Sequence, residues 1–180
     1  MQYDLEAPGR LQERFADSIV RVVVAAEDST SEPFVEVIPD AWADIAAALR
    51  DDEAFRFDYL NDLCVVDYCA NDKKTAKAVG DERLEVVYHL SSVSRKRQLT
   101  VKATLPRWAD ADAQTPPGLP SVAHLWATAE WHECEAYDLS GVVFIGHPNL
   151  RRILCPEDWV GHPLRKDYQM PLEYHGIRGR

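Results

Sequence analysis

The sequence predicts an α+β protein: a mixed, largely antiparallel sheet with helices packed on one face, followed by a long extended C-terminal tail. Runs of β-branched residues indicate several strands, two of which read as a long hairpin. Two segments carry the capping signals or apolar spacing of helices. The last 35 residues hold four prolines and no regular pattern. We therefore expect a body domain at residues 1–145 and a docking tail at residues 146–180, one ordinary domain plus an extension.

The body opens with two predicted strands and a helix. β-branched and alternating apolar residues at 18–26 and 32–38 are typical of strands. Asp40 is a favourable N-cap for the helix that follows. We expect this helix to end near Arg50, because the negative charges at 51–53 are unfavourable at a helix C-terminus. Its apolar face has the i, i+3, i+4, i+7 spacing and consists of Trp42, Ile45, Ala46 and Leu49.

The middle of the body is predicted to be rich in strands. Short strands are expected at 55–60 and 63–68, and the polar stretch 71–81 is typical of a loop. The strongest strand signals are at 84–90 and 98–105, and only a short polar stretch separates them. We expect these two runs to form a long antiparallel hairpin.

The end of the body is predicted to return to helices. Four prolines and one glycine at 106–120 indicate a connector. Residues 121–126 are expected to form a short helix capped by the serine at its start. Thr128 is expected to cap a second helix that ends near Gly141, a residue favoured just beyond a helix C-terminus. Residues 142–145 should be extended and lead into the tail.

The tail is apolar, yet its prolines prevent it from folding alone. Prolines at positions 148, 156, 163 and 171 exclude an ordinary helix or central strand. Disordered tails lack large apolar groups, whereas this one contains Leu150, Ile153, Leu154, Trp159, Leu164 and Tyr168. A body of this size is about 40 Å across, and a fully extended tail reaches ~115 Å. We expect the tail to cross its own domain and lie on a neighbouring protein; the alternative is that it coats its own body.

Charge and composition exclude two classes of partner. The net charge is −10, and the body carries 26 acidic against 14 basic residues, which disfavours binding to nucleic acid. The tail carries 6 basic and 4 acidic residues, which suits an acidic groove on a protein neighbour, although a chance excess explains it equally well. No run of roughly 18 apolar residues and no signal peptide is present, so we expect a cytoplasmic protein that meets a membrane only through partners.

The candidate catalytic groups are three carboxylates on one predicted helix, Glu133, Glu135 and Asp138. Glu135 and Asp138 share a helix face, and such a pair suits acid–base catalysis only if one member is desolvated. We favour structural pairing, because Arg151 and Arg152 follow closely and each can form a fork onto a carboxylate. We expect both arginines to be clamped onto buried carboxylates, either Glu135 and Asp138 or those of a partner.

The sequence predicts no metal, cluster or nucleotide site. His132 begins a pattern like the zinc motif H-E-x-x-H, but Ala136 stands where the second histidine belongs. His147 and His162 each precede a proline and lack a third ligand at a suitable spacing. There is no G-x-G-x-x-G or phosphate loop. The four cysteines form no C-x-x-C pair and are expected to be free thiols: Cys64, Cys69, Cys134 and Cys155.

Four stretches of sequence carry a family resemblance. GHPNLRRIL at 146–154 and PEDWVGHPLRKDY at 156–168 follow WHECEAYDLSG at 131–141, and FDYLNDLCVVDY at 57–68 is a weaker match. Together they resemble the C subunits of the proton-translocating NADH-quinone oxidoreductases, the thirty-kilodalton subunit family of respiratory complex I. The block at 131–141 is similar to that family's W-x-E-R-E-x-Y-D-x-x-G element. Cys134 stands where the family usually has arginine, so no salt bridge of that arginine is transferred.

The resemblance implies a structural and assembly subunit, because members of that family hold neither a redox centre nor a substrate site. It implies a role in bracing the quinone-site D subunit and the cluster-bearing B and I subunits of the peripheral arm, while electrons pass from NADH to quinone and protons are translocated. NADH, FMN, iron–sulfur clusters and quinone would then be bound by partner proteins of the complex, and none by this chain. The implied location is peripheral, on the cytoplasmic side of the cell inner membrane. The tail is expected to contact its partner through His147, Leu150, Arg151, Arg152, Ile153, Leu154, Trp159, His162, Leu164, Arg165, Lys166 and Tyr168.

Three alternatives remain open from the sequence. The chain fits the same position in a related quinone-reducing or hydrogenase complex, since the electron donor is bound elsewhere. A stand-alone hydrolase or isomerase would use Glu133, Glu135 and Asp138 and would be active as a monomer. A free-standing adaptor would bind an unrelated target with its tail. Co-purified proteins discriminate the first and third, and activity of the purified chain tests the second.

Overall fold

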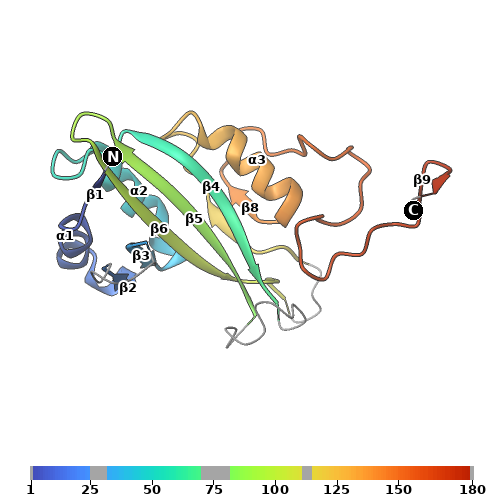
Figure 1. Cartoon of the computed structure of the whole chain (residues 1–180), viewed down its shortest axis with the longest axis horizontal. Helices are drawn as coiled ribbons and strands as arrows, with labels where there is room; N and C mark the ends of the chain where they lie inside the picture. Colours follow the sequence, from blue (N-terminus) through green and yellow to red (C-terminus); the bar gives the residue numbers. More distant parts are fainter. Residues whose placement is uncertain (1, 25–31, 70–81, 111–114, 179–180) are drawn as a thin grey trace.

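A computed structural model describes residues 2–24, 32–69, 82–110 and 115–178 of the chain (Figure 1). Its main sheet has the strand order β2-β3-β6-β5-β4, and β1 pairs with the start of β6. The pairs β1–β6 and β3–β6 are parallel and the others antiparallel, so the predicted mixed, largely antiparallel sheet is confirmed. The strands are β1 (Gln2–Tyr3), β2 (Ile19–Val23), β3 (Phe34–Val37), β4 (Tyr59–Tyr68), β5 (Arg83–Ser92) and β6 (Arg97–Pro106).

The predicted hairpin is the centre of this sheet. β5 and β6 pair in continuous antiparallel register from Arg83–Pro106 to Ser92–Arg97. Alternate residues of β5, among them Val86 and Tyr88, are completely buried on one face. The predicted loop at 71–81 and residues 111–114 of the connector lie outside the described part of the chain.

Helix α2 (Trp42–Asp51) covers the buried face of the sheet, behind the long strands in Figure 1. Its predicted apolar stripe is confirmed, since Trp42, Ile45 and Leu49 are all fully buried. The rings of Trp42 and Tyr88 lie 4.3 Å apart. Each large side chain buried in this way contributes roughly 1.5–3 kcal/mol. The apolar spacing that predicted the helix therefore also supplies the core between helix and sheet.

Two further helices lie next to the two end strands of the sheet, β2 and β4. Helix α1 (Ala7–Arg14) lies beside β2 and buries Ala7 and Leu11. Helix α3 (Ala129–Ser140) lies along the edge strand β4 (Figure 1). It ends at Gly141, whose φ of 72° is the left-handed conformation that glycine adopts at no steric cost, as predicted. In the described part of the chain, no helix is both long and apolar enough to cross a bilayer.

Two predicted helix caps are wrong. Asp40 lies inside a 3₁₀ turn (Pro39–Ala41) that precedes α2, and α2 has no side-chain cap. Thr128 stands at the N-cap position of α3, but its hydroxyl donates to the carbonyl of Leu60, 3.0 Å away. That hydroxyl therefore joins α3 to β4 instead of capping the helix. At Thr128 a tertiary contact replaces the local cap, whereas at Asp40 the preceding 3₁₀ turn moves the start of the α-helix to Trp42.

Three other local predictions are also corrected. The two short strands expected at 55–60 and 63–68 are one strand, β4, with an irregularity at Asn61, while residues 53–55 form a turn. The helix expected at 121–126 is a single turn, in which the hydroxyl oxygen of Ser121 accepts the backbone N–H of Ala123 while the hydroxyl donates to Glu133 of α3. The extended backbone expected at 142–145 is confirmed as β8 (Val143–Ile145), but its parallel pairing with β7 (Gly118–Pro120) in the connector was not predicted.

The segment after β8 leaves the body and ends far from it in Figure 1. Residues 146–172 form turns and irregular backbone. Two short antiparallel strands follow, β9 (Glu173–Tyr174) and β10 (Ile177–Arg178).

Candidate functional site

The tail is fastened to the end of α3 by one carboxylate, Asp138, which is fully buried. Its Oδ1 accepts a hydrogen bond from Nη1 of Arg152 at 2.7 Å. Its Oδ2 accepts the backbone N–H groups of Ile153, Leu154 and Cys155 at 3.0, 2.8 and 2.8 Å. Burial alone would raise the pKa of Asp138, but these donors outweigh it and lower the pKa to about 2. Asp138 therefore remains an anion and holds a whole turn of the tail.

Arg152 and His162 extend this anchor. The second guanidinium nitrogen of Arg152 donates to the carbonyl of Gly161 at 2.9 Å. Nδ1 of His162 lies 3.0 Å from the carbonyl oxygen of Asp138, and burial lowers the pKa of this imidazole. The His162 ring lies directly on Gly141, where a Cβ would come within 2.5 Å of it. Gly141 thus both ends α3 and makes room for the tail.

A second anchor lies about a dozen residues further along the tail, at Arg165. This side chain is buried, and its Nε donates to the carbonyl of Ser140 at 2.6 Å. Its Nη1 donates to the carbonyl of Arg107 at 2.8 Å, and its guanidinium lies over the ring of Trp108, 4.4 Å from the centroid. The next residue, Lys166, donates its backbone N–H to Oδ2 of Asp67 at 2.8 Å. The tail is therefore tied to β4, to the end of β6 and to α3.

A buried ion-pair network supports the second anchor. Arg107 makes a two-pronged contact with Asp67, with distances of 2.7 and 3.0 Å, and a further bond of 2.7 Å to Asp167 in the tail. Burial opposes the charge of Arg107, but the two carboxylates outweigh that effect and raise the pKa of Arg107. No sequence pattern predicted this network, because Arg107 is separated from Asp67 by 40 positions and from Asp167 by 60, and the three form no local motif.

The structure brings together some of the predicted tail residues and leaves others at the surface. Arg165 is buried, while His147, Leu150, Arg152, Ile153, Trp159, His162 and Tyr168 are half-buried and Arg151, Leu154, Leu164 and Lys166 are exposed. Arg151 lies over the ring of Trp131 at 5.7 Å, and Glu135 is exposed, so these two do not form the expected clamp. Trp159 packs on Tyr174 of its own chain, with ring centroids 5.0 Å apart.

Cys134, at the position where the family resemblance expects arginine, is buried among tail residues. Its sulfur lies 3.6 Å from the carbonyl oxygen of Asn149 and 3.9 Å from Nε2 of His147. The backbone N–H of Asn149 donates to Nδ1 of His147, so Nε2 carries the proton and donates to the carbonyl of Glu130 at 3.0 Å. Position 134 thus contributes a thiol that contacts the tail, where the family resemblance expects a guanidinium.

The three candidate catalytic carboxylates do not converge. Asp138 is saturated by the donors described above, and Glu135 is exposed. Glu133 is fully buried, and it accepts the hydroxyl of Ser121 at 2.6 Å and the backbone N–H of Val122 at 2.7 Å. Its burial outweighs these bonds and raises the pKa of Glu133 to about 7. Glu133 thus ties α3 to the turn after β7. Nε2 of His147 lies 3.9 Å from its Oε2, while neither Glu135 nor Asp138 is paired with it.

The raised pKa of Glu133 predicts a stability that falls with pH. Between about pH 4.5 and 7 the folded chain retains a proton on Glu133 that the unfolded chain releases, so unfolding becomes easier as pH rises and levels off above pH 7. We expect this group to remove about 3 kcal/mol of unfolding free energy across that window. Urea unfolding at several pH values, compared between the wild type and Glu133→Gln, measures the effect.

Glu135→Gln is the matched control for this experiment, because Glu135 lies on the same helix and is exposed. It should keep the wild-type pH dependence. His162 has the opposite sign: its lowered pKa makes stability rise with pH as the unfolded imidazole loses its proton, and this contribution is shared by all three proteins. Identical pH profiles for wild type and Glu133→Gln would contradict the prediction.

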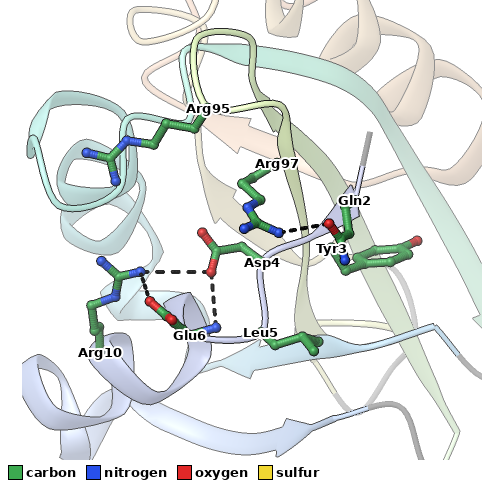
Figure 2. Close-up of a pocket in the computed structure, with 8 residues that line it drawn as sticks. All are labelled: Gln2, Tyr3, Asp4, Leu5, Glu6, Arg10, Arg95 and Arg97. Atoms are coloured by element: carbon green, nitrogen blue, oxygen red, sulfur yellow. Dashed lines mark hydrogen bonds and ion pairs between the residues drawn. The ribbon is translucent and has the colours of Figure 1, made fainter. Parts of the chain in front are cut away.

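A hollow of about 440 Å³ lies at the other end of the molecule, where three arginines gather (Figure 2). Arg10 lies beside Asp4 and Glu6, and Arg97 donates to the side-chain oxygen of Gln2 (Figure 2). Arg95 donates to backbone carbonyls of the turn that follows α2, including that of Ala54 at 2.8 Å. Each of these cations already has partners in the chain, so the hollow is not assigned as an anion site.

Comparison with known proteins gives the same result as the sequence motifs. The family model described as "Respiratory-chain NADH dehydrogenase, 30 Kd subunit" matches residues 35–174. A protein of Chloroherpeton thalassium, named as the C subunit of NADH-quinone oxidoreductase, is 44% identical over 170 residues, which cover 93% of this chain and 62% of that one. Its namesake in Chlorobium phaeobacteroides is 42% identical, and the match covers 93% of this chain and 90% of that one. The chain thus spans somewhat less than two thirds of one relative and nine tenths of the other.

Solved structures show the same fold. The trypsin-resistant fragment (1–134) of Nqo5 is 26% identical to this chain, with a TM-score of 0.59 and coverage of 81% of this chain and all of the fragment. A chain of the membrane-bound sulfane sulfur reductase, an archaeal respiratory membrane complex, superimposes with a TM-score of 0.61 at 22% identity over 92% of this chain. From the extent of the family match and the identity to these relatives, the chain belongs to the thirty-kilodalton subunit family of respiratory-chain NADH dehydrogenases, the family of the C subunits.

Proposed function

We propose that this chain is a non-catalytic, bracing subunit of an NADH-quinone oxidoreductase. In this role it holds the quinone-site D subunit and the cluster-bearing B and I subunits in fixed relative positions in the peripheral arm, on the cytoplasmic side of the inner membrane. NADH, FMN, iron–sulfur clusters and quinone are bound by the partner proteins of the complex. Family membership supports the assignment to the complex. The dispersal of the three candidate carboxylates supports a structural role for this chain.

The observation that carries the bracing role is uncovered apolar surface on a tail that is otherwise anchored. Arg152 and Arg165 fix the path of the tail across the body, yet large apolar side chains along the same path point to solvent. Val160 is 85% exposed and Leu172 is 89% exposed. The other members of this surface are Leu154, Leu164, Met170 and Ile177. Apolar patches of this kind, on a held backbone, are typical of a surface that a protein partner covers.

The anchors and the exposed side chains have separate tasks in this proposal. Asp138 and Arg107 set the path of the first two thirds of the tail within the chain itself. The exposed residues then present apolar groups to the neighbour. Because the backbone is already positioned, less conformational entropy is lost on assembly than for a free tail.

Val160→Asp tests this function. The side chain of Val160 is 85% exposed and has little packing to lose in the isolated chain, so we expect its free energy of unfolding to stay within about 0.5 kcal/mol of wild type. In the assembly the new carboxylate would be buried without a partner, which costs several kcal/mol. We therefore expect more than tenfold less of this protein in the affinity-purified complex, together with a matching loss of NADH-to-quinone activity in membranes.

Val93→Asp is the matched control. Val93 is 57% exposed in the turn between β5 and β6, at the far end of the molecule from the tail. It should assemble and function as wild type does. If Val160→Asp is incorporated as well as Val93→Asp, the tail surface does not contact a partner and the bracing proposal fails.

A further inference from the structure

The register of β4 and β5 places three metal-binding side chain types on the outer face of the sheet. Asp62 on β4 is paired with His89 on β5. Cys64 lies two residues further along β4 and therefore shares the face of Asp62. The irregularity at Asn61 turns Asp62 and Cys64 toward the outer face. Leu60, which precedes the irregularity, is buried in the core. After Asn61 the alternation of inward and outward side chains along β4 resumes one residue out of phase.

These three side chains converge. One ligand atom each of Asp62, Cys64 and His89 lies within 4.8 Å of the other two. In a tetrahedral zinc site, with bonds of about 2.0–2.3 Å, ligand atoms lie roughly 3.3–3.8 Å apart. Side-chain adjustments of about 1 Å bring the observed cluster to that geometry. No backbone movement is needed, because the β-sheet register already fixes the three Cα positions.

We propose that Asp62, Cys64 and His89 form a binding site for a zinc ion, with the fourth coordination position open to solvent. A thiolate, an imidazole and a carboxylate are the donor set that Zn²⁺ takes in proteins, whereas Mg²⁺ and Ca²⁺ take oxygen ligands. The thiolate and the carboxylate together balance the charge of the ion. No other trio of this kind occurs among the described residues.

The surroundings of the cluster support a metal site. Nδ1 of His89 lies 3.2 Å from the hydroxyl of Thr100, its paired residue on β6, and an outer partner on one ring nitrogen leaves Nε2 available to a metal. On the other side, Nδ1 of His132 on α3 lies 3.6 Å from Asp62. Asp62 and Cys64 also line a hollow of about 250 Å³ between β4 and α3, which gives an ion access.

Binding of zinc to this site exchanges the S–H bond of Cys64 for one sulfur–metal bond and releases the thiol proton to solvent. Leu164, a member of the exposed apolar surface of the tail, lines the same hollow as Asp62 and Cys64, so the entrance to this site borders the surface proposed for the partner.

The test uses the purified full chain, with a phosphine reductant to keep the thiols reduced. Zn²⁺ is titrated in competition with a chelating dye, and Co²⁺ is used as the coloured substitute. We expect one Zn²⁺ per chain, a Co²⁺ spectrum with a thiolate charge-transfer band, and no binding of Mg²⁺. Cys64→Ser should remove the charge-transfer band, and His89→Ala should weaken binding at least tenfold. Thr100→Val removes only the outer hydroxyl and should weaken binding about tenfold.

Two control variants and the melting temperature complete the test. Cys155→Ser and His124→Ala change the same residue types away from the cluster and should bind zinc as wild type does. Zinc should raise the melting temperature of wild type and of both controls but not of Cys64→Ser. Absence of binding to the wild type, or zinc and cobalt binding that persists unchanged in Cys64→Ser, would overturn the proposal.

Discussion

Replacing Asp138 with asparagine should release the tail from α3 and lower the free energy of unfolding by about 3–5 kcal/mol. The carboxylate accepts one bond from Arg152 and three from the consecutive backbone N–H groups of residues 153–155. The neutral amide of asparagine has only one oxygen to accept hydrogen bonds. Its NH₂ group is itself a donor and would face either the Arg152 guanidinium or the backbone N–H groups. Either Arg152 loses its partner or several N–H groups are left unpaired in a buried place.

Two measurements check this prediction. Urea unfolding gives the change in stability, and hydrogen exchange of the amides of 153–155 reports whether the tail opens locally. The exchange rates of these three amides should rise much more than those of β5. Because the pKa of Asp138 is lowered to about 2, its contribution is complete above about pH 4 and disappears as pH falls toward 2. Wild type should therefore lose stability in that acid window, and Asp138→Asn should not.

Asp158→Asn is the control for the loss of a tail carboxylate that is exposed. Asp158 accepts bonds from Tyr174 and His175 near the end of the chain, both at 2.8 Å. Exposed pairs contribute roughly 0–1 kcal/mol, so this variant should remain close to wild type. A change of similar size in Asp138→Asn and Asp158→Asn would show that Asp138 is not the anchor of the tail.

The elements that sequence predicted well are those with local causes. The β5–β6 hairpin follows from two β-branched runs close together in the chain, and the buried face of α2 follows from the spacing of Trp42, Ile45 and Leu49. The end of α3 at Gly141 follows from the conformational freedom of glycine. Each of these signals lies within about one turn or one hairpin of the structure that it predicts.

The elements that sequence missed have causes distant in the chain. β7 and β8 are paired across the whole of α3, and Thr128 is drawn away from its capping role by the carbonyl of Leu60, 68 positions earlier. The irregularity at Asn61 merges two expected strands and turns Asp62 outward, an outcome that depends on the register with β5. Such choices are made by packing, which no local pattern records.

The tail illustrates the same division. Sequence composition indicated that its apolar residues need a covering surface and that Arg152 needs a carboxylate. It could not choose between the chain's own carboxylate and that of a neighbour. The structure places Arg152 on Asp138, 14 positions away, and leaves Val160 and Leu172 uncovered. The charged residues of the tail are thus used within the chain, while several of its large apolar residues remain available to a partner.

Replacing Arg107 with methionine should destabilise the chain by about 3–5 kcal/mol, because it removes the charge that balances a buried carboxylate. Asp67 is 5% exposed, and without Arg107 it would retain only the backbone N–H of Lys166 among the bonds described above. The backbone carbonyl at position 107 would still accept the hydrogen bond from Arg165. The tail would therefore keep its path, and only the positive charge of Arg107 would be lost. Urea unfolding measures the change.

Arg21→Met is the matched control: Arg21 pairs with Glu36 at 3.1 Å but is itself 56% exposed, so its loss should cost under about 1 kcal/mol.

A double-mutant cycle then separates the ion pair from simple loss of packing. If Asp67 and Arg107 stabilise each other, Asp67→Asn combined with Arg107→Met should cost less than the two single changes together, with a coupling of roughly 1–3 kcal/mol. Asp167→Asn should couple to Arg107 more weakly, because Asp167 is partly exposed and its charge is better screened. Additive effects of Asp67→Asn and Arg107→Met would mean that these two side chains do not stabilise each other, and that Asp67 supports the tail only through its bond with the backbone N–H of Lys166.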